Sequence, residues 1–246
     1  MQRICHNHGA LLILDEVMSG IGRTGTLHAW EQENVIPDLQ TVAKGLGAGY
    51  LPIGAMMVSK KVVEALGGGS KVFVHSQTYQ GHAVASAAAV EVQRIIREDG
   101  LLGNVRERGE MLEKSLKDRI GGHKHVGDIR GRGLFWGVSI EPFPFLHPHV
   151  FNGLTNSCVQ LEFVCNKETK EPFPVKFAVA ATVHKTALMK YGVSCIPSSG
   201  GADGKLGDTV QLAPPYIVTE EEIGMIVERM AMAIEDVFGS MDFGEA

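Results

Sequence analysis

Two short segments of the sequence combine residue types that can carry out covalent chemistry. The apolar run Ala10–Leu14 ends in two acids, Asp15 and Glu16, and a later strand-like segment ends at Lys44, just before a glycine-rich turn. A desolvated lysine amine is a nucleophile that forms Schiff bases with carbonyl groups. A carboxylate close by stabilises a positive charge on a bound group. The two segments can therefore furnish a site for a covalently held cofactor.

The elements that must position these residues follow the pattern of an α/β protein. A continuous apolar run such as Ala10–Leu14 is typical of an interior strand that is covered on both faces. Ala83–Arg97 is rich in alanine, with β-branched residues at helical spacing, and predicts a helix closed by Asp99-Gly100. The other elements predicted here are strands at Thr41–Ala43 and Ile53–Ser59 and helices at Lys60–Leu66 and Leu101–Ile120.

Beyond Gly121-Gly122 the pattern changes to α+β. We place a domain border at these glycines, although a helix C-cap alone would explain them. The run Thr219-Glu220-Glu221-Glu222 is typical of a helix N-terminus and predicts a last helix reaching about Phe238. The remaining predicted elements are a glycine-bent strand at Val126–Val138, a helix at Pro174–Tyr191, and short strands at Val193–Ile196 and Val210–Ala213.

The segments around Asp15 and Lys44 resemble the class III (ω-amino acid or ornithine-type) aminotransferases, which are fold-type I enzymes that use pyridoxal 5′-phosphate. The resemblance rests on LLILDEVMSGIGRTG, TVAKGLGAGYLPIGA, HSQTYQGHAVASAAA and the ending GDTVQLAPPYIVTEEEI. It implies that Lys44 forms the Schiff base with the cofactor and that Asp15 pairs with its pyridine nitrogen. It also implies that Val17 lies beneath the cofactor ring, and that Thr78 reaches the phosphate of the neighbouring subunit's cofactor.

The same resemblance implies ping-pong transamination through a Lys44 aldimine, with an amine or amino acid as donor and a 2-oxo acid as acceptor. It implies a homodimer with shared active sites. Residues 1–120 would be the later part of the cofactor-binding large domain, and residues 121–246 the C-terminal α+β small domain. Two alternatives stay open, namely a racemase, mutase or decarboxylase of the same family and an inactive truncated product.

Composition excludes several other classes of function. The chain has 246 residues and a formal net charge of −5, without the basic stripe that nucleic acid binding favours. It contains no apolar run of the ~18–20 residues needed to span a bilayer, and its N-terminal apolar run is too short for a signal peptide. The four cysteines lack a CxxC pair, which favours reduced thiols and a cytoplasmic location. Cys5, His6 and His8 lack a second ligand cluster, so we predict no metal site.

Two features depart from the family pattern. The chain lacks a counterpart of the family's upstream phosphate-binding loop and ring-stacking aromatic, so we expect weak cofactor binding by the chain alone. Gln211 stands where family members often carry a carboxylate-binding arginine, and the preceding loop offers only Lys205. A lysine cannot make the bidentate contact of an arginine, so the sequence leaves the amino donor open.

A third departure is the segment Val138–Gln160. Its removal joins Gly137 to Leu161 and gives GLFWGLEFVCNKETKEPF, a continuous family-like strand and turn. Val138-Ser139 can be encoded by a splice-donor sequence, and a codon for Gln160 can supply the acceptor. We interpret the segment as an insertion and a candidate retained intron, with a genuine surface loop as the alternative.

Overall fold

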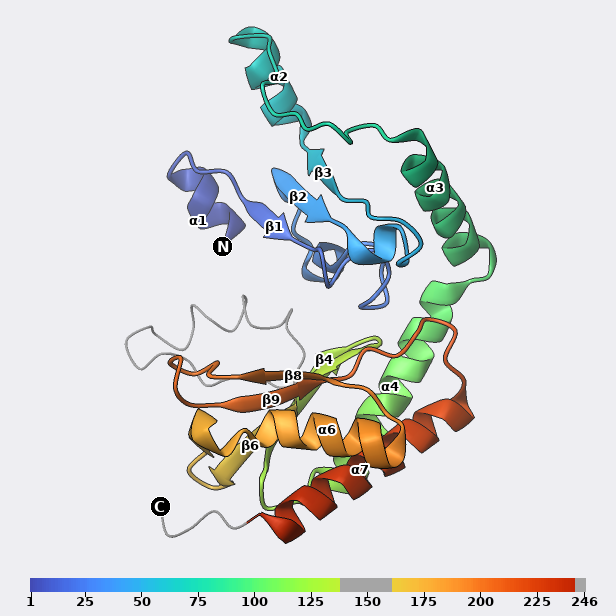
Figure 1. Cartoon of the computed structure of the whole chain (residues 1–246). Helices are drawn as coiled ribbons and strands as arrows, with labels where there is room; N and C mark the ends of the chain where they lie inside the picture. The colour runs from blue at the N-terminus through green and yellow to red at the C-terminus, as the bar shows by residue number, and fades with distance from the viewer. Residues whose placement is uncertain (138–160, 242–246) are drawn as a thin grey trace. The chain divides into compact units, whose positions relative to one another are not determined.

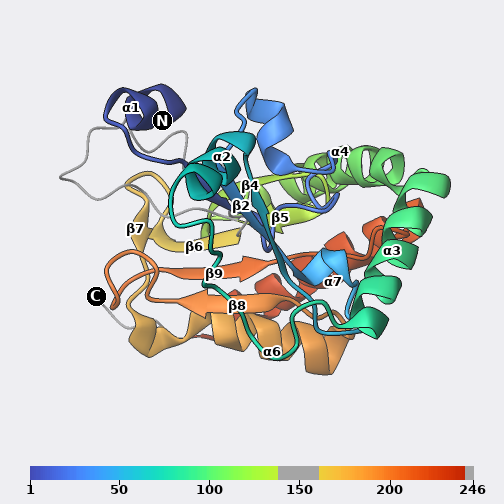
Figure 2. The ribbon, with the colours of Figure 1, turned by 90° about the horizontal axis from the view of Figure 1, so that it is seen from above.

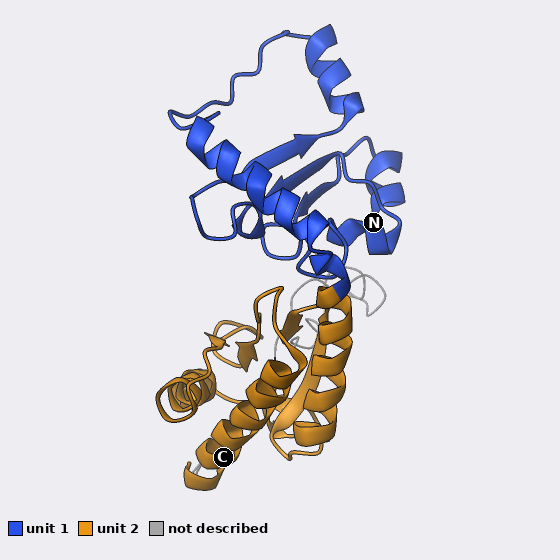
Figure 3. Cartoon of the chain, turned by 90° about the vertical axis from the view of Figure 1, so that its right-hand side faces the viewer, with its two compact units in different colours: residues 1–103 blue, residues 104–246 orange. Residues whose placement is uncertain are grey.

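The computed structural model describes residues 1–137 and 161–241 of the chain. The chain divides into two units, Met1–Gly103 and Asn104–Ala246, each with its own β-sheet (Figure 3). Both units combine helices with sheets, as the α/β prediction requires. The predicted insertion at residues 138–160 lies outside the described residues.

The strands that precede Asp15 and Lys44 are neighbours in the sheet of the first unit (Figure 1). Strands β1 (Ile13–Asp15) and β2 (Leu39–Val42) pair in parallel, and β3 (Ala55–Val58) pairs antiparallel with the other edge of β2. Parallel strands run in the same direction, so the carboxyl ends of β1 and β2 meet at one edge of the sheet.

The chain before β1 forms a short helix, α1 (Gln2–Asn7), which the sequence pattern did not predict. The Leu12 amide donates to the Asp38 carboxylate at 2.8 Å, and His6 lies 2.9 Å from the same oxygen. Those two hydrogen bonds hold the pKa of the Asp38 carboxyl below its usual range. Because Asp38 takes the Leu12 amide, β1 begins at Ile13, later than predicted.

The two longer helices of the first unit agree with their predicted positions to within two residues. Helix α3 (Ala83–Glu98) buries four residues spaced three or four positions apart, as an amphipathic helix does. The remaining elements of this unit are α2 (Lys60–Gly68) and the 3₁₀ turns η1 (Ala29–Glu33) and η2 (Lys44–Leu46).

The second unit packs helices against a mainly antiparallel sheet. Its strand order is β5-β4-β6-β9-β8, with β7 paired to β6. Helices α6 and α7 lie side by side in two perpendicular views (Figures 1 and 2). The elements are α4 (Leu101–Ile120), β4 (Val126–Arg132), β5 (Phe135–Gly137), β6 (Leu161–Asn166), β7 (Glu171–Pro172), η4 (Val175–Phe177), α6 (Val179–Tyr191), β8 (Ile196–Ser199), β9 (Asp208–Gln211) and α7 (Glu220–Ser240).

The apolar face of α4 explains where the chain divides. Val105, Leu112 and Leu116 of this helix are completely buried in the core of the second unit. The division therefore falls at the start of α4, whereas the predicted border at Gly121-Gly122 lies at the turn where the helix ends. None of the helices within the described ranges is long and apolar enough to cross a membrane.

Strands β5 and β6 both pair with β4, at consecutive positions along it. Arg130 of β4 lies opposite Gly137, and the preceding residue, Ile129, lies opposite Leu161. One step along β4 therefore moves from the last residue of β5 to the first residue of β6. The predicted bent strand at 126–138 is in fact a hairpin, because β4 and β5 pair antiparallel.

Candidate functional site

The parallel pairing of β1 and β2 sets Asp15 and Lys44 at the same edge of the sheet. Asp15 is the last residue of β1 and lies opposite Thr41 of β2. Lys44 is the first residue of the 3₁₀ turn that follows β2. In open α/β sheets, ligands bind outside the carboxyl ends of strands. The two residues that the sequence singled out are therefore delivered by adjacent strands to such a position.

The carboxylate of Asp15 is held through only one of its oxygens. Its Oδ1 accepts hydrogen bonds from the Val17 amide at 3.0 Å and from the Thr41 hydroxyl at 3.1 Å. Among the described residues no donor contacts Oδ2, and the residue is exposed. One oxygen of the carboxylate is thus available for a donor supplied by a bound group.

Lys44 presents its amine without a protein partner. The side chain is exposed, and no described residue forms an ion pair or a side-chain hydrogen bond with it. Its backbone φ is +40°, a left-handed conformation that costs a lysine free energy. Strained residues of this kind concentrate at functional sites. The amine is free to react with a carbonyl group.

The other two predicted site residues are placed less directly. Val17 is half-buried and contacts Asp15 through its backbone amide. Thr78 lies exposed in a turn, and no contact joins it to Asp15 or Lys44 in the described structure. The structure places Asp15, Val17 and Lys44 at or just after the carboxyl ends of β1 and β2, whereas Thr78 lies in a separate loop.

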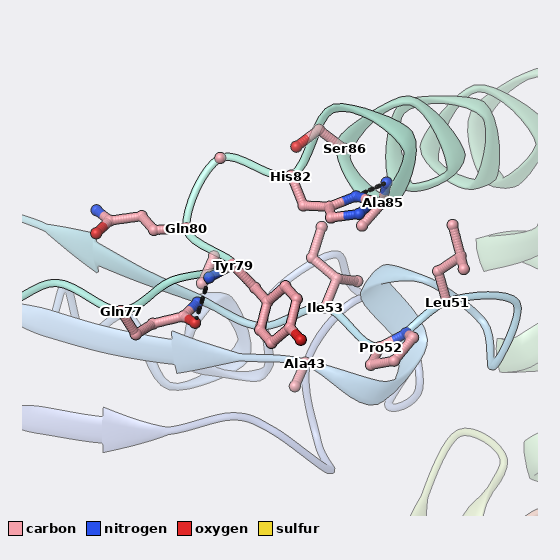
Figure 4. Close-up of a pocket in the computed structure, with 13 residues that line it drawn as sticks. Ala43, Leu51, Pro52, Ile53, Gln77, Tyr79, Gln80, His82, Ala85 and Ser86 are labelled. Carbon is pink, nitrogen blue, oxygen red and sulfur yellow. Dashed lines mark hydrogen bonds between the residues drawn. The ribbon is translucent and has the colours of Figure 1, made fainter.

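A cavity of about 980 Å³ lies within the first unit, and none of the four predicted site residues lines it (Figure 4). Its walls include Ala43, which precedes Lys44, and Gln77 and Tyr79, which flank Thr78. The Tyr79 ring extends toward Ala43 in Figure 4. The remaining lining residues are Leu51, Pro52, Ile53, Gly54, Ala55, Gln80, Gly81, His82, Ala85 and Ser86.

Sequence reasoning missed the structural role of Glu16, the residue after Asp15. Glu16 is only 4% exposed and accepts hydrogen bonds from the amides of Ala29 and Trp30 and from the Gln40 side chain, at 2.8–3.0 Å. Successive strand residues point to opposite faces, so Asp15 faces the site while Glu16 faces the interior. The signal in the sequence was a second polar residue, Gln40, in the neighbouring strand, where it lies opposite Leu14.

Two other predictions concern residues away from the carboxyl ends of β1 and β2. His6 is engaged by Asp38, and no metal-binding group of three His, Cys, Asp or Glu residues occurs in the described portion of the chain. Gln211, at the position where the family often has an arginine, is buried in β9 opposite Ile196.

The site residues fit pyridoxal 5′-phosphate at the two points where they can be tested. An unpaired lysine amine suits the cofactor's aldehyde, and a carboxylate with one free oxygen suits its protonated ring nitrogen. Both groups are exposed at the same strand edge. This chemistry supports assigning Lys44 and Asp15 to cofactor binding.

Comparison with known proteins identifies the family of the chain. Residues 1–234 match the family model described as aminotransferase class-III. An aminotransferase of Gibberella zeae is 47% identical over 234 residues, which are 95% of this chain and 41% of that protein. An uncharacterized aminotransferase of Schizosaccharomyces pombe is 40% identical, covering 98% of this chain and 47% of its own length.

Solved transaminase structures share the fold. The transaminase from a marine Virgibacillus superposes with a TM-score of 0.80 at 32% identity, over 96% of this chain and 47% of that one. The (S)-enantioselective ω-transaminase of Thermomicrobium roseum has a TM-score of 0.76 at 31% identity, over 96% of this chain and 45% of that one. The chain spans about half the length of the proteins it matches.

Proposed function

Since the chain belongs to the class III aminotransferase family, we propose that the protein containing it moves an amino group from an amine or amino acid to a 2-oxo acid. The proposal rests on two side chains at the carboxyl ends of the adjacent parallel strands β1 and β2. The Lys44 amine has no partner in the described structure, and Asp15 accepts hydrogen bonds through only one of its two carboxylate oxygens. The cofactor in this proposal is pyridoxal 5′-phosphate. When bound, it supplies a carbonyl group that bonds to amines and a ring that withdraws electrons.

Each residue then has a stated task. Lys44 would hold the cofactor through its amine, and the same amine, when free, would act as the base that accepts a proton from the substrate carbon. Asp15 Oδ2 would accept a hydrogen bond from the protonated ring nitrogen and keep it charged, since a carboxylate stabilises a cation. Val17 would contact the cofactor ring.

The proposal includes a homodimer in which Thr78 binds the phosphate of the cofactor held by the partner subunit. Its position in an exposed turn, without a hydrogen bond to Asp15 or Lys44 in the described structure, supports a role toward another subunit's site. A cytoplasmic location is part of the same proposal. It is supported by Cys5, Cys165 and Cys195, which are unpaired thiols.

A trapping experiment tests the assignment of Lys44. The 246-residue chain is incubated with excess pyridoxal phosphate, reduced with borohydride and digested, and the labelled peptide is identified by mass spectrometry. We expect the label on Lys44 in the wild type and its loss in Lys44→Arg. A label confined to Lys60 or Lys61, which begin helix α2, would contradict the assignment.

A second measurement separates amino transfer from the other reactions of such sites. The protein is supplied with a ¹⁵N-labelled amine and pyruvate, and the product alanine is analysed. Transfer of the label to alanine supports an aminotransferase. Asp15→Asn should lower this rate by orders of magnitude, because an amide cannot stabilise the ring charge as a carboxylate does.

A further inference from the structure

We propose that Thr41 is a positioning residue that fixes which oxygen of Asp15 faces the cofactor. The inference rests on the proposed function, because it assigns Asp15 to the cofactor's ring nitrogen. Thr41 lies directly opposite Asp15 in the parallel pairing of β1 and β2. Its hydroxyl donates to Asp15 Oδ1 at 3.1 Å.

Two donors on one oxygen define the orientation of the carboxylate group. An aspartate carboxyl rotates broadly about its last torsion, so an exposed one ordinarily samples many orientations. Here the Thr41 hydroxyl and the Val17 amide both contact Oδ1, at 3.1 and 3.0 Å, from β2 and from the residues after β1. Oδ1 is thereby occupied, and Oδ2 is the oxygen left for the ring nitrogen.

The position of Thr41 also links the two site residues. Thr41 belongs to β2, whose end leads into Lys44, whereas Asp15 belongs to β1. The hydroxyl therefore connects the strand that delivers the lysine to the carboxylate on its neighbour. On the opposite face of the same strands Gln40 donates to Glu16 at 3.0 Å, but that pair is buried. Of the two cross-strand pairs, only the Thr41–Asp15 pair lies on the face of the site.

The strand pairing itself does not depend on the hydroxyl. The backbone carbonyl of Thr41 accepts from the Glu16 amide at 2.9 Å, and a substitution of the side chain leaves this bond in place. Valine has the branched shape of threonine without the hydroxyl, so Thr41→Val removes the donor and preserves the strand. Thr41→Ser retains the donor and serves as the matched control.

The experiment measures the affinity for pyridoxal phosphate by titrating the visible absorbance of the lysine-bound cofactor. We expect Thr41→Val to weaken affinity by about three- to tenfold, the effect of losing one hydrogen bond of ordinary strength. Thr41→Ser should stay within about twofold of the wild type. Unfolding temperatures of all variants are recorded to confirm that each is folded.

A double-mutant cycle with Asp15→Ala decides whether Thr41 acts through Asp15. Without the carboxylate, Thr41→Val should have no further effect on affinity, because its acceptor is gone. An equal loss in both backgrounds, or no loss in the Thr41→Val single variant, would overturn the inference. Failure of the proposed function has a different signature, since the wild type itself would then show no borohydride label on Lys44.

Discussion

Gly137 and Leu161 occupy consecutive positions along the neighbouring strands, although residues 138–160 separate them in the sequence. Along β4, Arg130 faces Gly137 and Ile129 faces Leu161. Strand β9 gives the same register independently, since Leu212 bridges to Trp136 and Val210 lies opposite Leu161. Moving two residues along β9, from Leu212 to Val210, therefore corresponds to moving two positions, from Trp136 past Gly137 to Leu161. Strands β5 and β6 are two parts of one strand.

This register predicts the result of deleting Val138–Gln160. The deletion joins Gly137 directly to Leu161 with every pair of β4 and β9 unchanged. Because closing a long loop costs entropy, we expect the deletion variant to be as stable as the full chain, or more stable by about 1–3 kcal/mol. Urea denaturation of the two proteins measures the difference.

A matched control removes one residue fewer. Deleting residues 138–159 leaves Gln160 between the two strands and displaces β6 by one position. A one-residue slip turns buried side chains such as Leu161 and Phe163 toward the opposite face, so this variant should be less stable by several kcal/mol. Equal stability of the two deletion variants would contradict the continuous register.

The left-handed backbone of Lys44 predicts different stabilities for two variants that both lack its amine. Lys44→Ala keeps the strain of φ +40°, whereas Lys44→Gly relieves it because glycine adopts this conformation freely. We expect the glycine variant to be more stable than the alanine variant by about 1 kcal/mol, as measured by chemical denaturation. Neither should carry a borohydride-stable cofactor label. A more stable alanine variant would show that the conformation is not strained.

The buried carboxylate of Glu16 predicts a strong structural effect beside the site. Glu16→Gln turns an acceptor of three hydrogen bonds into a group that also donates, so at least one donor loses its partner. We expect the free energy of unfolding to fall by about 1–3 kcal/mol. Glu64→Gln is the control, because Glu64 is exposed and forms only a surface pair with Lys60. Similar losses in both variants would contradict a special role for Glu16.

Local patterns predicted many elements of the fold well. The predicted helix Leu101–Ile120 is α4 without a change of boundary. The Thr219 cap is confirmed. Its side chain accepts a hydrogen bond from the Glu222 amide, and the Glu222 carboxylate accepts one from the Thr219 amide. These features depend on residues three or four positions apart, so the sequence alone contains the information. Asp15 and Lys44 could likewise be singled out from local patterns, because Asp15 ends β1 and Lys44 begins the turn that follows β2.

Long-range contacts explain what the sequence pattern missed. The predicted helix Pro174–Tyr191 is divided at Ala178, and α6 begins at Val179. The cause lies in β9, where the buried Asp208 carboxylate accepts from the Ala180 amide at 3.0 Å. The contacts of Thr41 with Asp15 and of Gln40 with Glu16 also depend on strand register, which no local pattern specifies.

Two histidines of the second unit predict a loss of stability in mild acid. The His125 ring stacks on Phe238 with centroids 4.5 Å apart, and the His123 ring lies 5.3 Å from the same side chain. Burial is the largest cause that lowers the pKa of each histidine below its usual value. In the unfolded chain these groups titrate near pH ~6.5, so below that pH the unfolded state binds more protons than the folded state. Stability should therefore fall as the pH decreases from about 7 through the lowered folded pKa values.

Substituting one histidine isolates this effect from the carboxylates that also titrate in acid. His125→Phe keeps an aromatic ring beside Phe238 and removes a titrating group, so its unfolding free energy should fall less steeply between about pH 7 and pH 5 than that of the wild type. His8→Gln is the control, because His8 is exposed, and its slope should match the wild type. The readout is the slope with pH, so a constant loss from the missing His125–Val164 hydrogen bond does not affect it. If His125→Phe and His8→Gln give the same slope as the wild type, the half-buried His123 and His125 do not set the acid sensitivity of this unit.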